Sequence, residues 1–505
     1  MKGLKFYIGL IGGIFIFLFV AIFLNLDPGH PEVTYTLAIA ILMAIWWITE
    51  VVPLAITSLI PIVLFPAFGI MNGQDVSATY FNHVIFLFIG GFIIALAMQK
   101  WNLHKRIALK ILMVTGISPG RILLGFMLAT AFLSMWISNT ATTMMMVPIL
   151  ISIIGKLEDI IGKAEIKRYS IGLLLGVAYS ASIGGIATLV GTPPNLSFAR
   201  IFQIMFPDAP EISFASWFIF AFPVTLIFFM IIWIYLYLLF KPKKSGWAII
   251  DINDFKHQYK NLGPVSFEEK SVFIIFTGLA IMWLTRSDIQ IGRYQFTGWS
   301  SLFPYSSYIN DGTVAILASV ILFLIPARTL KDKFLMDWET AQGIPWNIVL
   351  LFGGGFALAS GFKESNLTVW FGSQLSFVAD YHPFLVIIVI CTMMTFLTEL
   401  TSNTATTEML LPILAGLSVS VEINPLLFML PVTLSGSMAF MLPVATPPNA
   451  IVFGTGRLQV MDMARNGLAL NFIGVIIISL VTWFIGTRLF DIAIETFPAW
   501  AGGNP

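Results

Sequence analysis

One motif occurs twice in this sequence, as "SNTATTMMMVPIL" at residues 138–150 and as "SNTATTEMLLPIL" at residues 402–414. Each copy is preceded by a glycine-rich stretch, "FLFIGGF" at 86–92 and "LLFGGGF" at 350–356, and the spacing from the second-last glycine to the serine is the same in both. Each copy is followed by a double proline, in "GTPPN" at 191–195 and "ATPPN" at 445–449. Three landmarks in the same order indicate an internal duplication.

The composition places the duplicated chain in a membrane. Of 505 residues, 58% are hydrophobic and 10% are charged, whereas a soluble protein has about 25% charged residues. Mean hydropathy is +0.90, and apolar runs of about twenty residues recur along the whole chain. We therefore predict an all-α polytopic membrane protein, which excludes a soluble enzyme.

Few other classes of site are indicated. The single Cys391 excludes a disulfide framework, and the five histidines have no metal-ligand spacing. The net charge of +1 points to no particular partner, and we expect the lipid bilayer as surroundings, no nucleic acid and no organic cofactor.

Basic and acidic loops predict the topology. We place the N-terminus in the cytoplasm, because the basic stretches then all fall inside, and the C-terminus outside the cell membrane. The first apolar run is long and lacks a small-residue cleavage site, so we expect it to be retained as a span. We predict two re-entrant hairpins, at 121–155 and 384–419, and eleven spans near 5–25, 35–51, 53–70, 83–99, 170–206, 214–240, 270–286, 311–328, 346–362, 425–460 and 467–490.

The duplication then becomes an inverted repeat. Each unit contains five spans and one hairpin, and an odd number of spans gives the two units opposite orientations, as in many secondary transporters. The hairpins enter from opposite sides, and their tips can meet near the midplane. Two full crossings in place of each hairpin would leave the loops on the same sides, so charge does not distinguish these alternatives.

The repeated motifs have a structural and a functional interpretation. Ser, Asn and Thr are good N-caps, and Pro-Pro breaks helices. A helix broken in hydrocarbon leaves costly unsatisfied backbone groups, so such breaks survive where they line a cavity or a site. Helices that start after Thr140, Asn195, Thr404 and Asn449 would point their positive ends at one place, which predicts an anion site without side-chain cations. The hydroxyl and amide groups present suit carboxylate oxygens, and equally Na⁺.

The sequence leaves open the role of three acidic residues that lie in apolar surroundings. Glu399 and Glu408 occur only in the second unit, and each can be a structural cap or face a cavity. Glu50 can pair at a helix end.

The doubled Ser-Asn-Thr, the Thr-Pro-Pro loops and "WWITEVVPLAITSLIP" at 46–61 resemble the divalent anion/sodium symporter (INDY-type) family of dicarboxylate, citrate and sulfate carriers. The resemblance covers nearly the whole chain. It implies a homodimer in which each protomer has a scaffold and a mobile transport domain that moves as an elevator. The implied scaffold is 1–112 and 241–372, and the implied transport domain is 113–212 (with the first hairpin and broken helix), the helix 213–240, and 373–505 (with the second hairpin and broken helix).

The resemblance also implies the site residues. A first sodium ion would bind Ser134, Ser138, Asn139 and the backbone of Gly191, and a second would bind Thr398, Asn403 and the backbone of Ala445. The family often has a small residue where Thr401 stands. Implied substrate ligands are Ser138, Asn139, Thr140, Thr192, Pro193, Ser402, Asn403, Thr404, Thr446 and Pro447.

Together these observations predict a secondary active transporter of C4-type dicarboxylates such as succinate, malate, fumarate and 2-oxoglutarate, coupled to Na⁺. The alternative is a Na⁺-independent dicarboxylate exchanger, since the family includes such proteins with similar motifs; a citrate or sulfate carrier ranks below both. A membrane protease would need a nucleophile–base pair or a motif such as H-E-x-x-H, which is absent from the sequence. A channel would need a charged ring or a carbonyl filter.

Overall fold

The computed structural model describes residues 4–242, 253–291, 294–329, 333–494 and 496–502. The regular secondary structure of these residues is helical, as predicted, apart from one small hairpin of two three-residue strands. The first unit comprises α1 (Leu4–Phe23), α2 (Pro31–Thr49), α3 (Leu54–Thr57), α4 (Ile60–Ala67), α5 (Gly73–Thr79), α6 (His83–Lys100), α7 (Leu103–Thr115), α8 (Pro119–Ser134), α9 (Asn139–Ile161), α10 (Lys163–Ile186), α11 (Pro193–Met205) and α12 (Phe214–Phe240).

The second unit begins differently and includes a strand pair, and it repeats the order of the first unit from the glycine-rich helix onward. It comprises α13 (Asn253–Asn261), α14 (Phe267–Leu284), β1 (Ile289–Ile291), β2 (Tyr294–Phe296), α15 (Asp311–Leu324), α16 (Trp338–Ala341), α17 (Trp346–Glu364), α18 (Leu367–Gln374), α19 (Pro383–Leu397), α20 (Asn403–Ser420), α21 (Leu426–Ser435), α22 (Pro447–Phe453), α23 (Val460–Val481) and α24 (Thr487–Leu489). Below, α8–α9 is the first hairpin and α19–α20 is the second hairpin.

Six helical segments in the described part of the chain are long and apolar enough to cross a membrane: α1, α2, α5 with α6, α10, α12, and α23 with α24. The remaining apolar segments are shorter or interrupted, so the number of full crossings stays a prediction. The span predicted near 53–70 is interrupted by a short turn. Here α3 ends at Thr57 and α4 restarts at Ile60, and the indole N–H of Trp47 donates to Leu54 O and to Ser58 Oγ beside the break.

The duplication is visible in the order of helices. The pairs α6 and α17, α7 and α18, α8 and α19, and α9 and α20 occupy equivalent places, offset by 264 residues. Even the backbone irregularities repeat, because Asn102 and Asn366 precede α7 and α18 in the left-handed conformation, with φ of 57° and 58°. A shared strained turn at equivalent positions supports one ancestral unit.

The two units interlock rather than lie side by side. Helix α6 of the first unit packs against α15 of the second, and α17 of the second packs against α3 of the first. A methyl group at Gly90 would lie 2.6 Å from Ala315 Cβ, and one at Gly354 would lie 2.5 Å from Ser58 Cβ. The equivalent glycines therefore let helices of opposite units approach closely.

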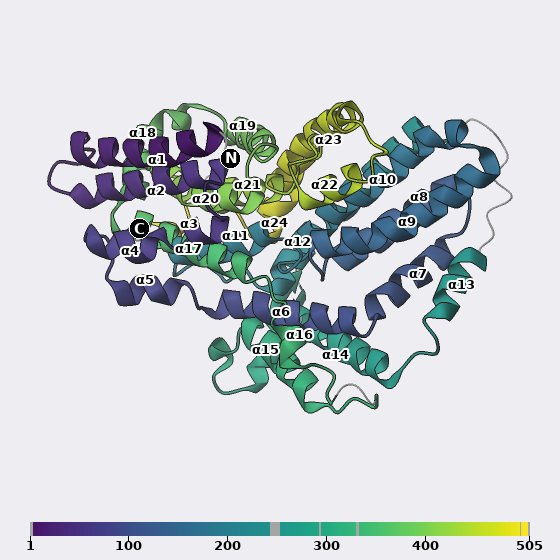
Figure 1. Cartoon of the computed structure of the whole chain (residues 1–505). Coiled ribbons are helices and arrows are strands. Elements are labelled where there is room, and N and C mark those ends of the chain that lie inside the picture. The colour runs from purple at the N-terminus through teal and green to yellow at the C-terminus, as the bar shows by residue number, and fades with distance from the viewer. Residues whose placement is uncertain (1–3, 243–252, 292–293, 330–332, 495, 503–505) are drawn as a thin grey trace.

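Figure 1 shows the resulting arrangement. The pair α1 and α2 lies at one end of the molecule, and α8, α9 and α10 run alongside one another at the other end. Helices α14 and α15 lie below α6 in this view. The broken helices meet between these groups, which positions the site described next.

Candidate functional site

The two Ser-Asn-Thr motifs form the turns of the two hairpins. Helix α9 begins at Asn139, and its N-cap Ser138 accepts a hydrogen bond from the backbone N–H of Ala141 at 3.3 Å. Helix α20 begins at Asn403, and Ser402 caps it through the N–H of Ala405 at 3.5 Å. The prediction that these helices start after the threonines is wrong, because the serine supplies the cap and the asparagine and threonine fall in the first turn.

The Thr-Pro-Pro loops lie at the breaks in two helices. Helix α10 ends at Ile186 and α11 begins at Pro193, while α21 ends at Ser435 and α22 begins at Pro447. The N-caps are Thr192 and Thr446. The predicted starts after Asn195 and Asn449 are therefore three residues late, because proline fits the first turn of a helix, where no backbone N–H is needed.

Asn195 and Asn449 have a different task, which is to close the breaks. The side-chain amide of Asn195 donates to the carbonyls of Gly185 at 3.2 Å, Ile186 at 3.2 Å and Thr188 at 2.7 Å. The amide of Asn449 donates in the same way to Ala439 O at 3.1 Å and Leu442 O at 3.0 Å. Each buried asparagine thus satisfies carbonyls that the unwound backbone exposes.

Glu399 performs a related task for backbone N–H groups. Its Oε1 accepts hydrogen bonds from the N–H groups of Phe440 at 2.8 Å and Met441 at 2.9 Å and from Asn471 Nδ2 at 2.8 Å. Its Oε2 accepts from the N–H of Leu442 at 3.0 Å. Glu399 is therefore a cap that fastens the second hairpin to the unwound segment before α22.

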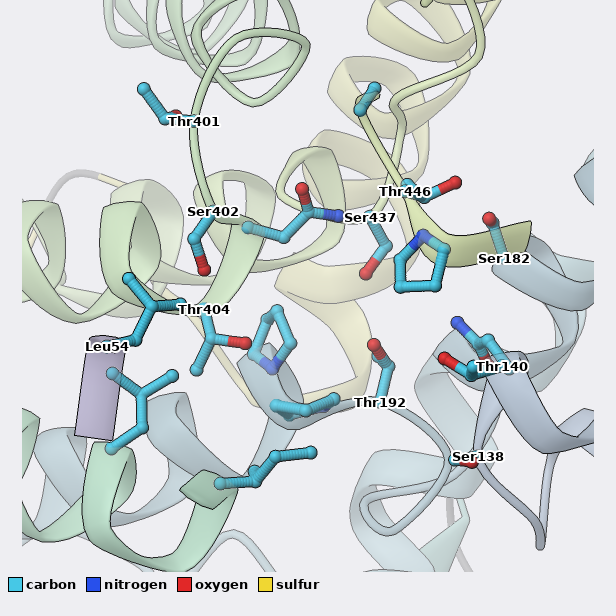
Figure 2. A pocket seen from close by; sticks show the side chains of 18 of the residues that line it. Leu54, Ser138, Thr140, Ser182, Thr192, Thr401, Ser402, Thr404, Ser437 and Thr446 are labelled. Atoms are coloured by element: carbon cyan, nitrogen blue, oxygen red, sulfur yellow. The ribbon is translucent and has the colours of Figure 1, made fainter. Parts of the chain in front are cut away.

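A cavity of about 860 Å³ lies where the hairpin turns and the breaks meet. Figure 2 shows hydroxyl-bearing side chains of both units around this space. The only charged side chain among the described lining residues is Glu50, and no lysine, arginine or histidine is present there. All ten predicted substrate ligands line the cavity: Ser138, Asn139, Thr140, Thr192, Pro193, Ser402, Asn403, Thr404, Thr446 and Pro447.

The predicted sodium ligands divide into two groups. Ser138, Asn139, Gly191, Asn403 and Ala445 line the cavity. In contrast, the side chains of Ser134 and Thr398 are fully buried behind its wall.

The lining also includes polar residues that the sequence analysis missed. Ser182 and Ser437 face the cavity from the ends of the broken helices, and Asn347 contributes from the start of α17. A second doublet could have revealed the serines, since "SAS" at 180–182 is echoed by "SGS" at 435–437. Within the described structure, none of these four buried serine hydroxyls has a hydrogen-bond partner.

The oxygen atoms at the first hairpin fit a cation. Ser134 Oγ lies 2.6 Å from Asn139 Oδ1 and 2.7 Å from Ala181 O. A hydroxyl has one hydrogen, so it can donate to only one of these two acceptors. A methyl group at Gly185 would lie 2.7 Å from Asn139 Oδ1 and 3.0 Å from Gly191 O, which places further oxygens in the same cradle. Hydroxyl, amide and carbonyl oxygens crowded in this way are suitable ligands for Na⁺.

The second hairpin has a similar set of oxygen atoms, which are less closely spaced. Asn403 Oδ1 is buried without a hydrogen-bond partner among the described residues. The hydroxyl of Thr398 donates to Thr395 O at 3.1 Å, which leaves its lone pairs available. An unpaired amide oxygen at the cavity that Ala445 also lines is suited to a cation or to a water molecule.

The sequence matches known proteins over most of its length. The family model described as the sodium:sulfate symporter transmembrane region matches residues 7–491. The sodium-dependent dicarboxylate transporter SdcS of Staphylococcus saprophyticus is 42% identical over 488 residues, which cover 95% of this chain and 91% of that protein. A Staphylococcus aureus protein of the same name is 43% identical over 498 residues, or 97% of this chain and 92% of the relative.

A solved structure has the same fold. The Alcanivorax borkumensis YdaH transporter matches 84% of this chain and 88% of its own chain, with a TM-score of 0.55 and 12% sequence identity.

Proposed function

This chain belongs to the divalent anion/sodium symporter family, and we propose that it is a secondary active transporter of C4-type dicarboxylates that uses Na⁺ as its coupling ion. It is a transporter and not an enzyme, as the sequence predicted, and a multi-pass protein of the cell membrane. The proposed substrates are succinate, malate, fumarate and 2-oxoglutarate. The relatives named above as sodium-dependent dicarboxylate transporters support both the substrate class and the ion.

The observation that carries this proposal is that the described lining of the cavity is suited to an anion although it contains no cationic side chain. Helices α9, α20 and α11 begin at its wall, and each helix start carries about +0.5 charge and free N–H donors. Helix α22 has only seven residues and adds little. A dianion needs more positive charge than three helix ends supply, so bound cations would complete the balance. The ten hydroxyl, amide and proline residues that line the cavity are the proposed substrate ligands.

We assign the first cation to Ser134, Ser138, Asn139 and the carbonyl of Gly191, and the second to Thr398, Asn403 and the carbonyl of Ala445. The close oxygens at the first hairpin and the unpaired Asn403 Oδ1 at the second support these assignments. Since Asn139 and Asn403 each belong to a cation set and to the substrate set, filling one set orders the ligands of the other.

Replacing Gly185 with alanine tests the first cation site. The new methyl group would overlap Asn139 Oδ1 and press on Gly191 O, so two cation ligands have to move. We expect the Na⁺ concentration for half-maximal uptake to rise by about tenfold or more, as for other displaced metal ligands. The measurement is succinate uptake as a function of Na⁺ concentration.

Gly155→Ala is the matched control, because nothing lies within 4 Å of its new methyl group. An unchanged Na⁺ dependence in Gly185→Ala would place the cation elsewhere.

For the mechanism we propose an elevator, in which residues 113–240 and 373–505 move against a scaffold of residues 1–112 and 241–372, and the protein works as a homodimer. Contacts of α10 with α8, α9 and α12 support a transport domain of this composition. Hydrogen bonds cross the proposed boundary, among them those from the N–H of Phe214 to Asp311 Oδ2 at 2.8 Å, from Arg286 Nη2 to Glu211 Oε1 at 2.8 Å and from Lys363 Nζ to Ile204 O at 2.9 Å. The first of them joins α12 to α15. Any sliding of α12 past α15 has to break it.

The orientation with a cytoplasmic N-terminus and an extracytoplasmic C-terminus assigns a state to the structure. The end of α2, with Thr49 and Glu50, and the start of α17, with Asn347, line the cavity. The charge pattern puts both of these helix ends on the cytoplasmic side. We therefore assign the structure to the inward-facing arrangement.

A Na⁺-independent dicarboxylate exchanger is the second candidate. The hydroxyls of Ser182 and Ser437 line the cavity and have no hydrogen-bond partner among the described residues. They favour the exchanger because they can bind substrate oxygens directly, with no bridging sodium ion. Citrate and sulfate rank below the C4 acids as substrates.

Labelled succinate uptake by the purified protein in liposomes separates these candidates. Each sample is run with and without an inward Na⁺ gradient, and with empty vesicles or vesicles preloaded with a dicarboxylate. We expect uptake into empty vesicles that requires Na⁺. Uptake confined to preloaded vesicles and indifferent to Na⁺ would make the protein an exchanger, and its cation residues would then be substrate ligands alone.

A further inference from the structure

A buried carboxyl group lies in the seam between the second hairpin and α17. Glu408 of α20 is fully buried, and its Oε1 accepts a hydrogen bond from Ser197 Oγ of α11 at 2.8 Å. Its side chain fills the space above Gly355 of α17, where an added methyl group would lie 2.3 Å from the carboxyl. Its other oxygen, Oε2, has no hydrogen-bond partner in the described part of the chain.

Among the residues that the structure describes, no lysine, arginine or histidine forms a hydrogen bond or ion pair with this carboxyl group. Of the titratable groups on the helices packed against it, Tyr80 interacts with it electrostatically, and the Tyr80 hydroxyl donates to Ser58 O. Arg200 of α11 binds Gln203 Oε1, and Lys363 of α17 binds Ile204 O. An ionised carboxylate enclosed in this way is far more costly than the neutral acid.

The equivalent place in the first unit is open. Met144 of α9 corresponds to Glu408 and is 61% exposed, whereas Glu408 is 0% exposed. Met144 lines a groove of about 570 Å³ between α7 and α9, together with His104 and Lys105. Gly91, the equivalent of Gly355, meets only Val190 and Trp283 at ordinary contact distances. Helix α20 of the second hairpin is thus docked on α17 and α18, whereas in the first hairpin α8 packs on α7 and a groove separates α7 from α9.

An inverted repeat gives this asymmetry a meaning. When two equivalent halves are packed differently, each half can adopt the packing that the other half now has. Folds with inverted repeats alternate between the two sides of a membrane in this way. In the exchanged arrangement Met144 docks at Gly91, and Glu408 leaves Gly355 for a groove like the one that now holds Met144.

We propose that Glu408 is a proton-binding site of the transport cycle, which holds its proton while docked on Gly355 and releases it to water when the second hairpin undocks. The proposal rests on the alternation between two arrangements proposed above. Since the docked state encloses the site, the proton binds and leaves from the same groove. The cycle then depends on pH without carrying a net proton across the membrane.

The sign of the pH effect follows from linkage. The docked arrangement binds the proton more tightly, so low pH favours it and high pH favours the exchanged arrangement. In the exchanged arrangement α7 and α9 close on one another. The distance between probes on these two helices therefore reports the exchange without any transport assay.

Spin-label distances in the purified full-length protein in lipid nanodiscs test the proposal. Labels are attached to Lys110→Cys on α7 and Ser152→Cys on α9, both exposed and outside the groove lining, with the buried Cys391 replaced by serine. From about pH 5.5 to about pH 8.5 we expect the short-distance population to grow by about tenfold or more relative to the long one. One linked proton changes this ratio at most tenfold per pH unit, so the increase over this range stays below about a thousandfold.

Variants at Glu408 make the test specific. Glu408→Gln keeps the shape without the titration and should lose the pH dependence, while Glu408→Asp should retain it. Glu364→Gln, at an exposed carboxyl on α17, is the matched control and should behave like the parent.

Two results would overturn the proposal and leave the proposed function intact, and a third would overturn both. One is an equal pH shift in Glu408→Gln. The other is a parent protein whose distances ignore pH although succinate with Na⁺ still changes them, which leaves the proposed function intact. If neither pH nor succinate changes the distances and uptake is also absent, the alternation fails and the proton site fails with it.

Discussion

Replacing Asn139 or Asn403 with alanine should lower succinate uptake by about a hundredfold, because each substitution removes a contact to substrate and a ligand of a cation. A hydrogen bond to a charged group contributes about 1.5–3 kcal/mol, and a loss of about 3 kcal/mol corresponds to about a hundredfold. Both asparagines lie in the first turn of their hairpin helices and line the cavity. The measurement is initial uptake into proteoliposomes at equal protein density.

The symmetry of the fold sharpens this prediction. The two variants should be impaired to a similar degree, since Asn139 and Asn403 occupy equivalent positions in the two units. Asn261→Ala, at an exposed residue at the end of α13, is the control and should transport normally. Each purified variant should elute as the parent does in size-exclusion chromatography. Normal uptake by either hairpin variant would remove the central-site assignment.

Replacing Glu399 with leucine should destabilise the protein more than any other single change considered above. Four donors then lose their acceptor: the N–H groups of Phe440, Met441 and Leu442, and the amide of Asn471. Leaving a buried donor unpaired costs about 1–3 kcal/mol, so we expect a loss of about 4 kcal/mol or more and a Tm lower by about 10 °C. The measurement is thermal unfolding of the purified protein in detergent.

The internal repeat supplies the control for this experiment. Met135 occupies the place of Glu399 in the first unit, and Met135→Leu should change Tm little because the volume is conserved. A Glu399→Leu protein as stable as the Met135→Leu protein would show that the capping contacts contribute little.

The sequence could predict the site because its motifs are polar, repeated and located where helices have to break. Ser138 and Ser402 follow apolar runs that end abruptly, and in a membrane such a break needs a reason. All ten substrate candidates were found in this way or through the family resemblance, and the structure brings them to one cavity. The lining serines Ser182 and Ser437 were missed because a helical Ser-x-Ser in an apolar run carries no strong signal by itself.

Other errors have simpler physical origins. Reading Pro193 and Pro447 as breakers before a helix, rather than as its first residues, put the helix starts too late. The roles of Glu399 and Asn195 depend on partners 41 and 10 residues away, respectively. Such contacts are set by tertiary packing, and no local pattern encodes them. The same holds for the break after Thr57, where a tryptophan from the preceding helix binds the exposed groups.

Close contacts at two glycines join the halves of the chain, Gly90 with Ala315 and Gly354 with Ser58. These contacts bear on how the gene can be divided and on how it arose. Each half of the chain supplies a helix that the other half needs, so neither half has a complete interior alone. A chain cut between α12 and α13 should yield active protein only when both fragments are synthesised together. The single-unit ancestor, for the same reason, would have folded only by pairing with a second copy inserted upside down.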